Sequence, residues 1–487
     1  MNWNRRFLVL SLLLGSLLSA LEFTVIASIA PLLVAELDKA DWFAWASSGY
    51  MISSTVFTLI AGKLCDRIGR KPTFIAGTAI FAAGSIACGL APNMLVFIMG
   101  RLVQGLGGGL MVPASSTIVG DLYEGQRRVK IQGGFAATWG ICAIAGPVVG
   151  RFVAVQWDWR WLFLGLIPIS ILIIAMISLT MRETIISESR TPLDYRGMVL
   201  LSGSICSLLL LFETSGMLQL SFFLTAVILT GLLIRSLRAA TDPIIEPRLL
   251  RRADINVMYV VATVMGANTF VAITFFPFTE AWALGKQAAD SGQLLIPLTL
   301  GAVAATISCG TLVRLLSVKT LQLIGLSFML LGDLIVCILS DSSSERLVSV
   351  SAVCIGVGTG LLMPLLSSYI QQGANWSDKG MLTAYLSFFR SVGGSLGVIA
   401  AAFLFKQSLP ASFDWVSLNS PDIHHEAIAA DLNLPISFKQ TVMSGMHTVF
   451  GLCAALSAAG IAAVAIIPLQ SVIHHNKESD WSDGERM

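Results

Sequence analysis

The chain has 487 residues, of which 55% are hydrophobic and only 12% are charged, and its mean hydropathy is +0.78. Soluble globular proteins carry about 25% charged residues, so a water-soluble enzyme, a disordered chain and a nucleic-acid-binding protein are excluded. The formal net charge of +2 indicates no polyanionic partner. The composition predicts an all-α integral membrane protein whose surroundings are the lipid bilayer.

Apolar runs long enough to cross a bilayer as a helix, about 20 residues each, recur along the whole chain. The first run contains Glu22, is too long for the hydrophobic region of a signal peptide and lacks a cleavage site, so we expect it to remain as a span. We count fourteen spans, at 7–33, 43–61, 73–91, 94–115, 131–150, 161–181, 197–216, 218–235, 256–278, 291–312, 320–340, 347–370, 382–405 and 442–470.

The basic residues fix the orientation, because cytoplasmic loops accumulate Lys and Arg. With the N-terminus in the cytoplasm, twenty-two of the 31 basic residues fall in inner segments and seven in outer segments. Arg101 and Arg390 remain inside spans. We therefore expect both termini in the cytoplasm and the protein in the cytoplasmic (inner) membrane.

The short inner loop between the second and third spans reads GKLCDRIGRKP, residues 62–72. A cluster of basic residues that only sets the topology would need neither an acid nor two glycines at fixed places. The loop resembles the signature of the major facilitator superfamily. The matching residues are Gly62, Leu64, Asp66, Arg67, Gly69, Arg70 and Lys71.

The same loop returns 248 residues later in degenerate form, as GTLVRLLSVKT, residues 310–320. Gly310, Leu312 and Lys319 keep the spacing, whereas Asp66 and Gly69 have no counterparts. Two related six-helix halves with a substrate site between them are typical of transporters. The repeat predicts four parts: a first six-helix bundle (1–196), an inserted transmembrane hairpin (197–235), a basic cytoplasmic linker (236–255) and a second six-helix bundle (256–487) with an outer loop at 407–440.

The whole chain resembles the fourteen-helix drug:proton antiporter branch of that superfamily. Family-like segments are LEFTVIASIAP (21–31), RLVQGLGGG (101–109), WRWLFLGLIP (159–168) and RSVGGSLG (390–397). Departures are Glu22 in place of Asp, Ala27 in place of Asn and Arg151 in place of Gly. The fifth span resembles the antiporter motif, and the resemblance implies a bend that shapes a gate against leak. The residues of this gate are Gly140, Gly146, Pro147 and Gly150.

Few acids lie inside spans, where an unpaired charge is costly. At 1.5 Å per residue, Glu22 in the first span and Arg101 in the fourth both fall roughly 11–16 Å below the outer surface, so we expect them to meet. We expect Glu22 to carry the transported proton and Arg101 to bias its titration; the alternative is a static ion pair between the two helices.

The other embedded charges leave alternatives open. Asp333 lies mid-span and is a candidate second proton or cation site, whereas Glu213 lies near the outer interface, where a surface role is expected. Arg390 either pairs with an acid of the later spans or binds an anionic substrate. His424 and His425 in the outer loop are expected to be solvated and not to bind a metal. Trp157, Trp159 and Trp161 are expected to anchor the outer interface.

These features predict a transporter rather than an enzyme, since no nucleophile or His cluster is present. The expected activity is proton-coupled efflux of amphipathic, drug-like compounds by alternating access, with antibiotic resistance as its outcome. We expect a monomer that uses no cofactor other than protons as the coupling ion and takes a lipophilic or cationic small molecule as its substrate. The alternatives are an exporter of a physiological metabolite or siderophore and a membrane sensor that transports nothing.

Overall fold

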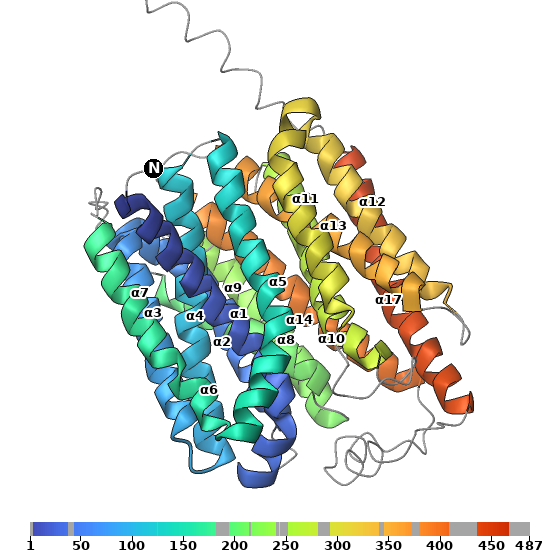
Figure 1. Cartoon of the computed structure of the whole chain (residues 1–487), viewed down its shortest axis with the longest axis horizontal. Coiled ribbons are helices and arrows are strands. Elements are labelled where there is room, and N and C mark those ends of the chain that lie inside the picture. The colour runs from blue at the N-terminus through green and yellow to red at the C-terminus, as the bar shows by residue number, and fades with distance from the viewer. Residues whose placement is uncertain are drawn as a thin grey trace, which may run out of the picture.

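The structure is a computed structural model, and it describes residues 3–37, 43–123, 125–181, 194–213, 216–239, 243, 252–280, 293–339, 345–372, 379–408 and 436–466. These residues form an all-helical protein (Figure 1). Ten of the described helical stretches are long and apolar enough to cross a membrane. All eight cysteines are free.

The helices of the first half lie on one side of the molecule, coloured blue to teal in Figure 1. An apolar run that we predicted as one span is divided at Gly165 into α6 and α7. The helices are α1 (Trp3–Leu37), α2 (Phe43–Ile68), α3 (Arg70–Gly89), α4 (Met94–Leu122), α5 (Gly125–Gln156), α6 (Arg160–Leu164) and α7 (Leu166–Thr180).

The helices of the second half, coloured yellow to red, lie on the other side. Contacts of α2 with α14 and of α5 with α11 join the two halves. The helices are α10 (Ala253–Phe278), α11 (Leu295–Leu315), α12 (Val318–Cys337), α13 (Glu345–Gln372), α14 (Lys379–Ser408) and α17 (Ile436–Ile466).

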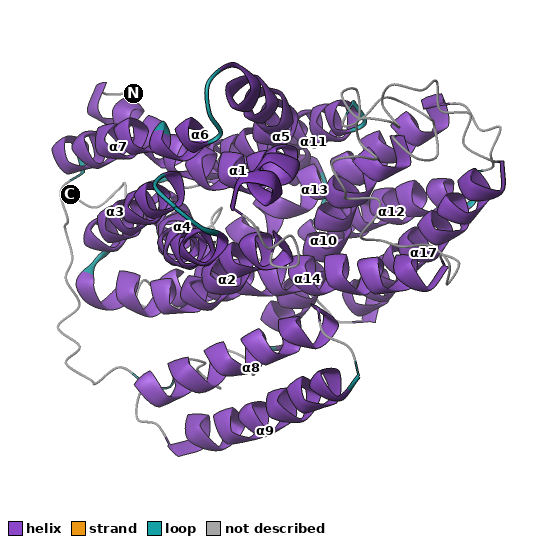
Figure 2. Cartoon of the chain, turned by 90° about the horizontal axis from the view of Figure 1, so that it is seen from below, coloured by secondary structure: helices purple, strands orange, loops and turns teal. Residues whose placement is uncertain are grey.

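Two further helices, α8 (Tyr195–Glu213) and α9 (Met217–Ala239), form a hairpin that turns at Gly216. Figure 2 shows them side by side along one edge of the molecule. α8 packs against α2 and α14, whereas most of the apolar side chains of α9, such as Met217 and Ile228, are exposed. Such a face is suited to lipid.

Glycines let the backbones of α3 and α4 come into close contact, as small residues do between membrane helices. A Cβ added to Gly107 would lie 2.3 Å from the backbone nitrogen of Phe81, and one added to Gly84 would lie 2.4 Å from that of Gln104. α4 also approaches α2, because a Cβ on Gly105 would lie 2.4 Å from the carbonyl oxygen of Tyr50. α4 is therefore held from two sides.

The loop repeat has a structural counterpart at the helix ends. Lys71 Nζ donates to the carbonyl oxygen of Ser178 in the last turn of α7, at 2.9 Å. Lys319, 248 positions later, donates to the carbonyl oxygen of Ala465 at the end of α17, also at 2.9 Å. Each lysine satisfies terminal carbonyls of the last helix in its half and places a positive charge at the negative end of that helix dipole.

Candidate functional site

Glu22 of α1 and Arg101 of α4 lie together in the interior of the first half. Arg101 Nη1 donates to Glu22 Oε1, and the two side chains are 1% and 4% exposed, respectively. Their equal depth in the membrane was expected from the sequence, and in the structure the two side chains also face each other. A buried ion pair thus joins α1 and α4.

Neutral groups from α1, α2, α3 and α4 complete the surroundings of this pair. Arg101 also donates to Gln104 Oε1 at 2.8 Å, and Gln104 Nε2 donates to the hydroxyl of Ser85 at 2.9 Å. The guanidinium carbon lies 4.7 Å from the ring centroid of Tyr50, whose hydroxyl is 2.7 Å from that of Ser19. Sequence reasoning missed these partners, although Gln104 is visible one turn after Arg101.

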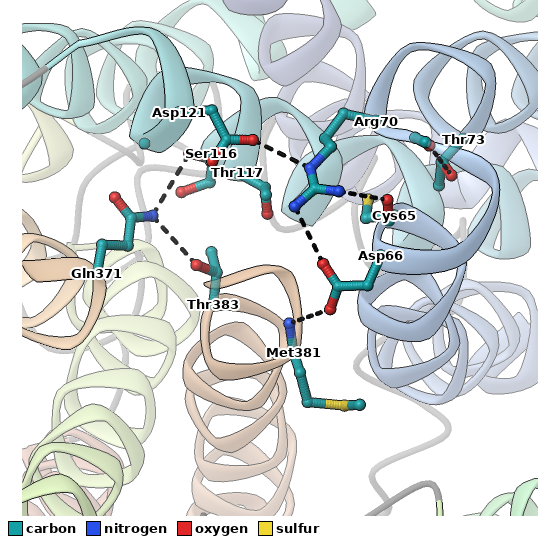
Figure 3. A network of polar contacts seen from close by, with 12 residues as sticks. Cys65, Asp66, Arg70, Thr73, Ser116, Thr117, Asp121, Gln371, Met381 and Thr383 are labelled. Carbon is teal, nitrogen blue, oxygen red and sulfur yellow. Dashed lines mark hydrogen bonds and ion pairs between the residues drawn. The ribbon is translucent and has the colours of Figure 1, made fainter. Parts of the chain in front are cut away.

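The inner loop motif connects the two halves (Figure 3). Asp66 accepts a hydrogen bond from the backbone N–H of Met381 in the first turn of α14, at 3.1 Å, and lies 3.2 Å from Arg70 Nη2. Arg70 is 2% exposed and donates to Asp121 at the end of α4, at 3.0 Å. The acid of the motif therefore meets the positive end of a helix dipole in the opposite half.

The other residues of the motif support this contact. A Cβ on Gly62 would lie 2.6 Å from Cβ of Ala384, so Gly62 lets α2 approach α14. Gly69 has a φ of 102°, a conformation that favours glycine in the turn between α2 and α3. Arg67 is half-buried at the end of α2. Gln371 of α13, which we did not predict, donates to Thr383 at 3.1 Å and to the carbonyl oxygen of Ser116 at 3.5 Å (Figure 3).

Gly140, one residue of the predicted gate of the fifth span, contacts the second half. A Cβ on Gly140 would lie 2.3 Å from Thr299 Cγ2, and the Thr299 hydroxyl donates to the carbonyl oxygen of Gly140 at 3.3 Å. Gly146 and Gly150 are buried in α5, which remains helical through Pro147. The side chains of Pro147, Ala27 and Arg151 lie outside the described residues.

A small, partly open cavity of about 50 Å³ lies between the halves, in contact with α1, α4, α5, α10, α13 and α14. Neither Glu22 nor Arg101 lines it. Arg390 does, with its guanidinium carbon 5.9 Å from the ring centroid of Trp139. Close packing holds its backbone, because a Cβ on Gly266 of α10 would lie 2.0 Å from the Arg390 carbonyl oxygen. The carboxylates of the described residues form no ion pair with Arg390.

Asp333 lies in the interior of the second half, away from the cavity. Its Oδ2 accepts hydrogen bonds from Asn268 Nδ2 of α10 at 2.8 Å and from the Ser457 hydroxyl of α17 at 3.1 Å, and its side chain is fully buried. Asp333 thus ties three helices together. The side chain of Glu213, the two loop histidines and most of the segments 236–255 and 407–440 lie outside the described residues.

The prediction of an outer aromatic belt is wrong for one of the three tryptophans. Trp157 and Trp161 are exposed, as expected, but Trp159 is buried and packs edge-on against Phe97, at a centroid distance of 5.8 Å. Its indole N–H donates to Glu36 at the end of α1, and Arg160 binds the same carboxylate at 2.6 Å. These two donors lower the pKa of Glu36, which lies beyond the predicted span.

The fold and the loop motif agree with a family comparison. The model of the major facilitator superfamily matches residues 12–398. The chain belongs to this superfamily. It is therefore a membrane transporter rather than an enzyme.

Two curated relatives come from Bacillus subtilis (strain 168). The chain is 29% identical to the multidrug transporter protein MdtP over 405 residues, which cover 81% of this chain and 74% of the relative. It is also 29% identical to multidrug resistance protein 3 over 401 residues, covering 81% and 78%. Among solved structures, the human organic anion transporter MFSD10 matches with a TM-score of 0.65 at 15% identity, covering 95% of this chain and all of that one, which shows the fold alone.

Proposed function

We propose that this transporter exports amphipathic, drug-like compounds and that proton entry drives the export. The observation that carries this proposal is the buried Glu22–Arg101 pair, a protonatable group held in the half of the molecule that also forms one wall of the cavity. Two relatives named as multidrug proteins support the substrate class. The predicted apolar character of the substrate agrees with the Phe, Met and Leu side chains in the cavity wall.

A change in the access of Glu22 to water or to Arg101 would let Glu22 take up a proton on one side and release it on the other. Each proton that moves down a membrane potential supplies about 2.3 kcal/mol per 100 mV. That free energy is enough to drive a solute uphill. A rocking motion of the two halves about the cavity is the corresponding mechanism.

We further propose fourteen spans with both termini in the cytoplasm of the inner membrane, in two six-helix bundles separated by the α8–α9 hairpin. The ten apolar helical stretches and the charge asymmetry of the loops support this topology. A fluorescent protein fused to the C-terminus should fluoresce, because it folds in the cytoplasm; a dark but stably expressed fusion would contradict the orientation.

The test of the function uses proteoliposomes that contain the purified protein and one of three dyes: rhodamine 6G as a cation, fluorescein as an anion and Nile red as a neutral compound. The wild-type protein should move at least one of them uphill when a pH gradient is imposed. Glu22→Gln should abolish that gradient-driven movement. The matched control is Glu36→Gln, the same change at the exposed end of the same helix, which should retain it.

Two outcomes would overturn the proposal in different ways. Gradient-driven movement by Glu22→Gln would show that Glu22 is not the proton carrier. Dye movement by the wild-type protein that ignores the pH gradient would show that export is not coupled to protons.

A further inference from the structure

The cavity between the halves has a single charged side chain in its wall, that of Arg390. The rest of the wall is apolar or neutral, with hydroxyl and amide groups from Ser16, Ser116, Gln132 and Ser387. A positive charge without a counter-ion is costly at this depth in a membrane protein. The wall therefore presents a cation that a bound anion would neutralise.

The buried acids of the described residues interact with groups other than Arg390. Glu22 pairs with Arg101, and Asp66 and Asp121 share Arg70. Asp333 accepts hydrogen bonds from Asn268 and Ser457, and the buried Glu280 accepts one from the backbone N–H of Leu294. The one interaction that the guanidinium of Arg390 makes with a described side chain is with the face of Trp139. An aromatic face orients a guanidinium but carries no charge to neutralise it.

Two buried hydroxyls of the same wall point to a ligand independently of the charge. Ser16 of α1 and Ser367 of α13 are 2% and 6% exposed, and neither hydroxyl has a hydrogen-bond partner among the described residues. Both line the cavity, from opposite halves. Buried polar groups are nearly always satisfied, so these two hydroxyls are suited to hydrogen-bond a bound molecule.

We propose that the cavity selects amphipathic organic anions. The anionic group, a carboxylate or sulfonate, pairs with Arg390, while the aromatic or aliphatic part packs against Trp139, Phe135 and Met363. Ser16 and Ser367 donate to acceptors on the substrate. This inference rests on the proposed export function. Of the lipophilic or cationic substrate expected from the sequence, it keeps the lipophilic character and replaces the positive charge, because Arg390 repels a cation.

Equilibrium binding to the purified protein tests the inference separately from transport. Fluorescein and rhodamine 6G share a xanthene skeleton but carry opposite charges at neutral pH, so their affinities compare charge at nearly constant shape. Fluorescence anisotropy would be measured with the wild type, Arg390→Gln, Arg390→Lys and the control Arg346→Gln. Arg346 is exposed at the start of α13, and its substitution removes the same charge away from the cavity.

The wild type should bind fluorescein more tightly than rhodamine 6G. Arg390→Gln should raise the Kd for fluorescein about tenfold or more, the usual effect of losing one charge-assisted contact. It should leave the Kd for rhodamine 6G equal or lower. Arg390→Lys should lie between, and Arg346→Gln should match the wild type.

A wild-type preference for rhodamine 6G, or fluorescein binding that survives Arg390→Gln, would overturn the inference. The first comparison needs no variant, so it decides the question even if Arg390→Gln does not fold. Fluorescein binding without gradient-driven transport of any dye would leave the anion site standing and refute the proposed function. Gradient-driven rhodamine 6G transport without fluorescein binding would support the proposed function and refute the anion site.

Discussion

Replacing Asp66 by Asn should loosen the contact between the two halves at the end where the loop motif lies. Asn keeps the size of the side chain and can still accept the hydrogen bond of Met381, but it removes the negative charge from the N-terminus of α14. Arg70 retains its bond to Asp121, so the first half itself should stay folded.

The magnitude follows from two losses. A carboxylate at a partly buried helix N-terminus contributes about 0.3–2 kcal/mol. A hydrogen bond to a charged acceptor contributes about 1 kcal/mol more than one to a neutral acceptor. We therefore expect the contact to weaken by about 1–3 kcal/mol, which changes the ratio of molecules with joined halves to molecules with separated halves about 5- to 150-fold.

Pulsed electron paramagnetic resonance measures that ratio directly. Spin labels on Ile68→Cys at the end of α2 and Ala253→Cys at the start of α10 report the separation of the halves, in a background where the native cysteines are replaced. Asp66→Asn should add or enlarge a population at longer distance. Asp158→Asn, a loss of the same charge at the other end of the first half, should not. Identical distance distributions for Asp66→Asn and its parent would refute the reasoning.

Two further predictions concern the remaining buried and exposed acids. Asp333→Asn should lower the thermal stability by about 1–3 kcal/mol, because it disturbs the bonds with Asn268 and Ser457, yet gradient-driven dye transport should persist; loss of transport in a stable variant would instead make Asp333 a second proton site. Glu36 has a lowered pKa in the folded protein, so its contact with Trp159 and Arg160 stabilises the fold above the ordinary Glu pKa and is lost as the pH falls through the lowered value. Glu36→Gln should therefore reduce the melting temperature at neutral pH, and the difference from the wild type should vanish in acid; a difference that persists at low pH would contradict this assignment.

The depth of a residue in the membrane could be predicted from the sequence, whereas the direction of its side chain could not. Glu22 and Arg101 meet because the rise per residue is fixed and both helices cross the same slab. The burial of Trp159 was missed because depth alone does not say that its side chain, directly before α6, turns inward toward Phe97.

The cavity shows the same limit. Its wall is formed by one face of each of six helices, and the rotation of each helix depends on packing against its neighbours. A residue such as Ser367 looks like ordinary small-residue packing in the sequence. The loop motif was easier to predict, because its residues are adjacent in the chain, but its partner at Met381 lies 315 positions away from Asp66.

The positions of these groups favour coupling through movement of α4. The Glu22–Arg101 pair does not line the cavity, so a proton on Glu22 cannot compete with substrate for one charge. α4 nevertheless carries three of these groups within about 30 Å of helix. They are Arg101, the cavity residue Ser116, and Asp121, which accepts a hydrogen bond from Arg70 of the loop motif. Pro113 lies between the first two of these and leaves the Gly109 carbonyl without its helical hydrogen bond, which gives α4 a place to bend. Under the proposed function, protonation of Glu22 would release Arg101, and α4 would carry the change to the substrate wall and to the contact at Asp66.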